Sequence, residues 1–178
     1  MTIEEKRKIA NKMIIRASQS LKFVKDYLSS RLNDIDEPYL RSLYILLSFS
    51  FELILKSRVI MLSAISDRNT LNTELQKLGH DFAKISQKLG SNELNNIDIK
   101  TISLNRSTGN YIITNIKDKK IDIYNFIDIR YSFMDKNEKM IFVKNSIHKE
   151  INNNINVMLK KKKKILNLNK VATTLQIK

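Results

Sequence analysis

Glycine and proline are scarce in this chain, and that scarcity limits the folds open to it more than any other feature. Its 178 residues contain three glycines and one proline. Hairpins and tight turns depend on these residues, so a strand-rich fold is disfavoured and long helices are favoured. The length suits one domain, and a hydrophobic content of 42% is normal for a globular protein. We therefore expect an all-α fold, an up-and-down bundle of four to five main helices.

Helix signals are clear in the first third of the chain. Thr2 and Glu5 form a capping box, and a stripe of apolar residues after them predicts a helix that ends near Leu32. Pro38 suits the first position of a second helix, because the N–H that proline lacks has no helical partner there. Residues 39–65 are apolar on nearly every side, which is typical of the central helix in a bundle.

Shorter elements are expected in the rest of the chain. The sequence QKLG occurs at residues 76–79 and again at 87–90, and each copy predicts a helix that ends at its glycine. Two β-prone runs around a polar turn predict a small β-hairpin insertion at residues 111–124. A last helix is predicted from about Asn137. We expect one helical domain over residues 1–168 and a basic, frayed tail over residues 169–178.

Positive charge is abundant and unevenly distributed. The net charge is +14, and residues 156–178 hold seven lysines and no acidic residue. Five of these lysines are consecutive and repel one another, so we expect the packed domain to end there, with little core beyond it. Because their potential attracts phosphate, they are the predicted nucleic-acid-binding residues: Lys160, Lys161, Lys162, Lys163 and Lys164. The alternative is compositional, since Lys, Asn and Ile are all abundant and all have AT-rich codons.

Several kinds of site and location are disfavoured by the sequence. Cysteine is absent, which excludes disulfides and thiol catalysis, and the two histidines lie far apart, so no metal site is expected. The three glycines form no phosphate-binding loop, and we expect no cofactor. Three charged residues within the apolar stretch 43–65 argue against a membrane span. Charges also replace the apolar region of a signal peptide, so we expect a cytoplasmic protein.

A few polar residues among the apolar helices mark a candidate ligand-binding site: Glu52, Lys56, His80, Asp81, Arg130 and Tyr131. Glu52 and Lys56 are four residues apart, in the favourable order for an ion pair. They either pair structurally between helices or project into a shared cleft. Asp81 is expected to cap a helix, which explains Asp81 fully and its neighbour His80 only partly. Since buried polar groups need partners, we predict that His80 and Arg130 meet in one cluster with Glu52 or Asp81.

The order of three stretches resembles the HEPN superfamily. They are YLRSLYILLSFSFELILKSRVI, LGHDFAKI and FIDIRYSFM, and a long last helix follows them. Members of this superfamily are small all-helical domains of toxin–antitoxin and antiviral systems, and some lie beside minimal nucleotidyltransferases. The resemblance covers roughly residues 38–160. It implies a homodimer, an RNA or nucleotide ligand, and an antitoxin or nucleotidyltransferase as the partner protein.

The resemblance also supplies a test for nuclease activity. Ribonucleases of the superfamily carry an arginine and, after four to six residues, a histidine that handles a proton at the 2′-hydroxyl. Arg130 matches the arginine, but the window after it reads YSFMDKN and contains no histidine. We therefore expect a non-catalytic module that binds RNA, a nucleotide or a protein partner. The alternatives are a metal-independent RNA endonuclease built on Arg130 and His80, and a purely structural subunit.

Overall fold

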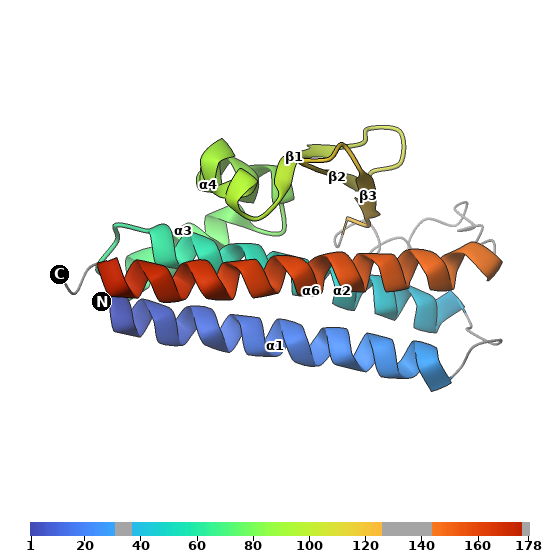
Figure 1. Cartoon of the computed structure of the whole chain (residues 1–178), viewed down its shortest axis with the longest axis horizontal. Helices are drawn as coiled ribbons and strands as arrows, with labels where there is room; N and C mark the ends of the chain where they lie inside the picture. The colour runs from blue at the N-terminus through green and yellow to red at the C-terminus, as the bar shows by residue number, and fades with distance from the viewer. Residues whose placement is uncertain (31–36, 126–143, 176–178) are drawn as a thin grey trace.

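The computed structural model describes residues 1–30, 37–125 and 144–175. Within these ranges the chain forms five helices and a small antiparallel sheet (Figure 1). In chain order the elements are α1 (Ile3–Ser30), α2 (Glu37–Leu62), α3 (Arg68–Leu78), α4 (Phe82–Asn96), β1 (Ile99–Leu104), β2 (Tyr111–Asn115), β3 (Lys120–Ile123) and α6 (Lys144–Leu175). The predicted helical bundle with a small β insertion is confirmed.

Three long helices, α1, α2 and α6, pack side by side and form the body of the bundle (Figure 1). Helix α1 is antiparallel to α2, since Lys6 near its start donates to the carbonyl of Ser63 just after the end of α2. Helices α2 and α6 run in the same direction, and α3, α4 and the sheet lie in the chain between them. Both ends of the chain lie at the same end of the bundle.

The start of α1 has the local chemistry that the sequence predicts. The backbone N–H of Thr2 donates to the Glu5 carboxylate at 2.6 Å, and the N–H of Glu5 donates to the Thr2 hydroxyl at 3.2 Å. These two bonds complete a capping box and satisfy amides that have no helical partner. One apolar stripe of α1 is then buried against the other two helices. Its residues are Ala10, Ile14, Ala17, Leu21, Val24 and Leu28.

Helix α2 is the core element of the bundle. Every residue from Phe51 to Met61 is buried, including the charged ones. The Phe51 ring is fully buried and meets Phe82 of α4 edge-on, with 5.3 Å between ring centroids. The predicted central helix is therefore confirmed. None of the helices in the described ranges has an apolar stretch long enough to cross a membrane.

The β insertion contains the predicted hairpin and one further strand. Strands β2 and β3 form the hairpin, and β1 pairs with the other side of β2 in the antiparallel order β1-β2-β3. Strand β1, with the sequence IKTISL, was not predicted. Its buried residues are three apart, because the pairing shifts at a bulge between Ile99 and Thr101. That bulge removes the period-two pattern by which a strand is recognised.

Helix α6 passes through the lysine run and continues to Leu175. Ile165 is fully buried, and Asn169 is buried as well, so packed structure extends beyond the lysines. The prediction of little core beyond the run is therefore wrong. The charges are tolerated because the helix presents only some of them to the core. The predicted basic tail over residues 169–178 stays a prediction.

Candidate functional site

Three of the predicted site residues form one buried polar cluster between α2 and the end of α3. Glu52 accepts a hydrogen bond from Lys56 Nζ through Oε1 at 2.8 Å, and from His80 Nδ1 through Oε2 at 2.6 Å. The Glu52 side chain is only 5% exposed, whereas His80 is 36% exposed. Glu52 and Lys56 form an ion pair, and His80 meets Glu52, while the choice between a structural pair and a shared cleft stays open because a cavity adjoins the pair.

Local backbone structure explains why His80 reaches this cluster. Gly79 ends α3 with a positive φ of 54°, a conformation that glycine adopts without steric cost. The turn presents the Gly79 carbonyl to Lys56, whose Nζ donates to it at 2.6 Å. His80 follows directly and reaches Glu52. One lysine and one carboxylate thus join the central helix to the turn after α3.

Asp81 serves as a helix cap, as predicted. Its carboxylate accepts hydrogen bonds from the backbone N–H groups of Ala83 and Lys84, at 2.9 and 3.2 Å. The hydroxyl of Tyr111 in β2 donates to the same oxygen at 3.1 Å. A carboxylate at a helix N-terminus also interacts favourably with the helix dipole. Asp81 therefore fixes α4 and attaches it to the sheet.

A cavity of about 450 Å³ lies beside the Glu52 cluster. It opens between α2 and α3, and Glu52, Lys56 and His80 themselves line it, together with Met13 of α1 and Leu75. The carboxylate of Glu52 could orient the His80 imidazole for proton transfer, as carboxylates do in general-base sites. However, Lys56 shares that carboxylate, and both oxygens of Glu52 are already bonded. This geometry suits a structural connection better than a reactive site.

Two of the predicted site residues, Arg130 and Tyr131, lie outside the described residues. The predicted meeting of His80 with Arg130 therefore stays a prediction. In the part of the chain that the structure describes, no three His, Cys, Asp or Glu side chains gather as a metal site would require.

The five lysines predicted to bind nucleic acid have three different environments. Lys161 is buried and donates to the backbone carbonyl of Asp98 at 2.7 Å, while Lys164 forms an ion pair with the Asp98 carboxylate at 2.6 Å. Burial lowers the pKa of Lys161 to about 8, and the bond from Lys164 lowers the pKa of Asp98. Lys162 faces α1, and Lys160 and Lys163 are exposed. Nucleic-acid binding by the five lysines stays a prediction.

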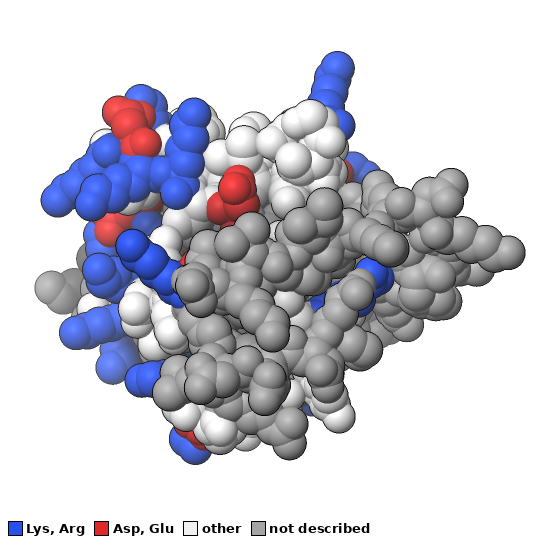
Figure 2. Space-filling model, turned by 90° about the vertical axis from the view of Figure 1, so that its right-hand side faces the viewer, with Lys and Arg blue, Asp and Glu red and all other residues white. Residues whose placement is uncertain are grey.

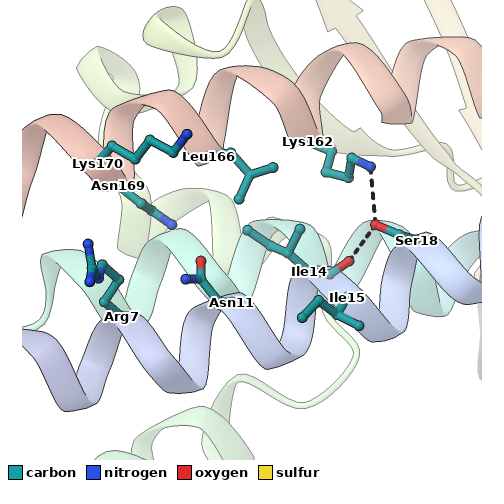
Figure 3. A pocket seen from close by; sticks show the side chains of 9 residues that line it. All are labelled: Arg7, Asn11, Ile14, Ile15, Ser18, Lys162, Leu166, Asn169 and Lys170. Atoms are coloured by element: carbon teal, nitrogen blue, oxygen red, sulfur yellow. Dashed lines mark hydrogen bonds between the residues drawn. The ribbon is translucent and has the colours of Figure 1, made fainter.

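A second cavity, which the sequence did not predict, lies between α1 and α6 (Figure 3). We call it the α1–α6 groove, and its volume is about 390 Å³. Lys162 donates to the Ser18 hydroxyl at 3.2 Å, and this hydroxyl donates to the Ile14 carbonyl at 2.7 Å. The groove is lined by Arg7, Asn11, Ile14, Ile15, Ser18, Lys162, Leu166, Asn169 and Lys170.

Charge in the α1–α6 groove has one sign. Its nine lining residues include three cations and no carboxylate. The Arg7 guanidinium reaches Glu4 at 2.8 Å, in a partly exposed pair outside the groove lining. Figure 2 shows one end of the molecule, where Lys and Arg side chains gather along one edge with few acidic side chains between them. The groove lies toward the opposite end of the molecule, near the start of α1 and the end of α6, so its charge is described by its lining residues alone.

The sequence carried only a weak signal for this groove. Arg7, Asn11 and Ser18 recur with helical spacing on α1, as do Lys162 and Asn169 on α6. Their meeting depends on the antiparallel packing of helices from the two ends of the chain, which spacing alone does not reveal.

Comparison of the chain with models of protein families, with curated proteins and with solved structures found no match. The HEPN resemblance therefore stays a prediction.

Proposed function

We propose that this protein is a non-catalytic RNA-binding module that holds the phosphate backbone in the α1–α6 groove. One observation carries the proposal: Arg7, Lys162 and Lys170 converge on a groove whose lining includes no carboxylate. A row of phosphates complements such a surface, and a net charge of +14 adds long-range attraction. The HEPN resemblance supports the same ligand class.

The groove offers suitable chemistry for a sugar–phosphate chain. The planar fork of Arg7 matches two phosphate oxygens, and lysine ammonium groups contact phosphates as point charges. The Asn11 amide can donate to a ribose hydroxyl or a phosphate oxygen. The side chains of Ile14, Ile15 and Leu166 provide apolar contact area. These contacts position a backbone without reading bases, so binding in the groove is independent of sequence.

Two observations support binding without cleavage. The window after Arg130 lacks the histidine that the superfamily's nucleases use. His80 is bonded to Glu52 at the polar cluster, and Glu52 is shared with Lys56. The endonuclease alternative remains a second candidate because the short Glu52–His80 bond resembles the orienting pair of a general base. A homodimer and an antitoxin or nucleotidyltransferase partner belong to the proposal as inferences from the resemblance.

Binding to a labelled RNA, measured by fluorescence anisotropy over a range of salt concentrations, tests the proposal. We expect affinity to fall as salt rises, and to fall severalfold at low salt in Arg7→Gln and Lys170→Gln. The matched control is Lys77→Gln, which removes an equally positive, 69% exposed side chain on α3. Loss of affinity in the control as large as in the groove variants would contradict a role specific to the groove.

The same samples separate binding from cleavage. Gel analysis of the RNA after incubation should show intact RNA with the wild-type protein and with His80→Ala. Cleavage by the wild type that disappears in His80→Ala would establish the endonuclease alternative in place of the binding module. Absence of binding even at low salt would instead support a structural subunit, since lysine-driven affinity is greatest there.

A further inference from the structure

Three aromatic rings form a stack across α1 and α2, at the end of the bundle away from the two termini. The ring centroids of Phe23 and Tyr27 are 6.3 Å apart, with 28° between the ring planes. The centroids of Tyr27 and Tyr39 are 5.8 Å apart, with 27° between the planes. The rings therefore form one nearly parallel series rather than three separate contacts.

The two outer rings of this stack are largely exposed. Phe23 is 57% exposed and Tyr39 is 51% exposed, whereas Tyr27 between them is partly buried. Phe23 therefore adds little to the core, although a buried aromatic side chain would stabilise the fold considerably. Contiguous exposed apolar rings are a feature of interaction surfaces, unlike single exposed apolar residues.

Cationic side chains continue the same stripe of α1 toward its N-terminus. Lys12, Arg16 and Phe23 are spaced by four and seven residues, which places them on one face of a helix. Lys12 and Arg16 are both exposed. At a rise of 1.5 Å per residue, Arg16 lies about 10 Å along the axis from Phe23, roughly the length of three stacked nucleotides.

We propose that this outer face of α1 binds single-stranded nucleic acid, with a base stacked on the exposed Phe23 ring and phosphates held by Arg16 and Lys12. The inference rests on the proposed RNA-binding function and adds a preference for unpaired bases. Proteins that bind single strands combine cations along the backbone with aromatic rings that stack on bases. The bases of duplex RNA have no free face for stacking, so its affinity for this surface would come from the cations alone.

A second copy of the chain fits this face less well. If two copies met through it with their α1 helices parallel, Lys12 and Arg16 of one copy would approach the same cations of the other. Juxtaposed like charges disfavour association. In a nucleic acid, the phosphates would place negative charge along the cationic half of the stripe. Its bases would lie along the aromatic half. Charge complementarity therefore favours nucleic acid as the occupant.

The test compares the affinity of the full-length protein for three RNAs: a single strand, an abasic single strand of the same length, and a duplex. We expect the wild type to bind the base-bearing strand about tenfold more tightly than the abasic strand. Phe23→Leu should remove this preference and leave affinity for the abasic strand and the duplex unchanged. Phe23→Tyr should retain the preference, because it keeps the ring. Leu62→Ala, which shortens another exposed apolar side chain, serves as the control.

The outcomes distinguish this inference from the proposed function. Equal wild-type affinity for base-bearing and abasic strands would overturn base stacking and leave backbone binding by the groove intact. Failure to bind any of the three RNAs would overturn both. Unchanged RNA affinity in Phe23→Leu, together with loss of a concentration-dependent dimer, would assign the face to a second copy of the chain and overturn the inference.

Discussion

The Glu52 cluster and the α1–α6 groove both contain several charged side chains, but the two regions differ in whether a carboxylate lies among the cations. In the cluster, Lys56 and His80 share one buried carboxylate, and Lys56 also donates to a backbone carbonyl. In the groove, three cations face a cavity whose lining has no carboxylate. The cations of the cluster thus share a buried carboxylate, whereas no carboxylate lines the groove, and Arg7 there pairs with Glu4 outside the lining.

Solvent exposure explains this difference. A charge removed from water requires a partner, because the desolvation cost otherwise amounts to several kcal/mol. The Glu52 cluster is such a case, and its bonds need no ligand for their explanation. Cations at an open groove remain hydrated, so the fold does not require their convergence. The paired charges of the buried cluster are thus explained by the fold. The cations that line the open groove are not, and from them we infer a ligand.

The largest effect should come from removing residues 160–178, which include the α6 wall of the groove. This deletion removes Ile165 from the core and Asn169 from its bond with the buried Arg58. We expect a loss of about 5 kcal/mol or more, enough to unfold a marginally stable domain. Circular dichroism and urea unfolding measure it. The control replaces the exposed Lys160 and Lys163 by glutamine and should leave the fold intact. A deletion variant that still folds would contradict the packing of α6.

Glu52→Ala should have the next largest effect, because it leaves buried Lys56 without its carboxylate. Breaking a buried pair on one side costs about 3 to 5 kcal/mol, although the remaining bond to Gly79 places the expected loss near the lower limit. The matched control is Glu4→Ala, which breaks the partly exposed pair with Arg7 and should cost less than about 1 kcal/mol. Similar losses of unfolding free energy in the two variants would contradict the claim that the buried pair stabilises the fold more than the exposed pair does.

Lys161 should make stability depend on pH as a buried cation does. Its folded-state pKa of about 8 lies below the roughly 10.4 of an unperturbed lysine, so between these values the unfolded chain binds more protons. The free energy of unfolding should therefore rise with pH, by roughly 1 to 2 kcal/mol from pH 7 to 9.5. Urea unfolding at both pH values measures this, and Lys161→Met should flatten the rise. An equal flattening by Lys163→Met, at an exposed position, would contradict this assignment.

The smallest effect on stability should come from the groove cations. Arg7→Gln and Lys170→Gln should each change the free energy of unfolding by less than about 0.5 kcal/mol, because neither side chain is buried. Thermal unfolding of the variants beside the wild type checks this. A loss above about 2 kcal/mol in either variant would show that the groove cations hold the helices together, as the Glu52 cluster does.

Local signals in the sequence predicted much of this molecule. The capping box at Thr2, the central helix and the cap at Asp81 each depend on residues close together in the chain, and all three are confirmed. The Glu52–His80 contact was anticipated as one of two alternatives, since His80 and Arg130 were predicted to meet in a cluster with Glu52 or Asp81. Scarcity of partners makes such a pairing predictable across 28 residues.

Features that depend on long-range packing were not predicted. A bulge removed the alternating pattern of strand β1, and the lysine run gave no sign that two of its members bind Asp98. The groove requires residues near both ends of the chain to meet, as Ser18 and Lys162 do. Spacing along one helix gives the face of a residue but not the helix opposite it.

The slope of log affinity for single-stranded RNA against log salt concentration tests the central claim most directly. It should be measured for the wild type, for a triple variant with glutamine at Arg7, Lys162 and Lys170, and for Glu52→Gln. Each lost phosphate contact should reduce the magnitude of the slope by about 0.7, so the triple variant should lose about 2 while Glu52→Gln keeps the wild-type slope. An unchanged slope in the triple variant would contradict the account.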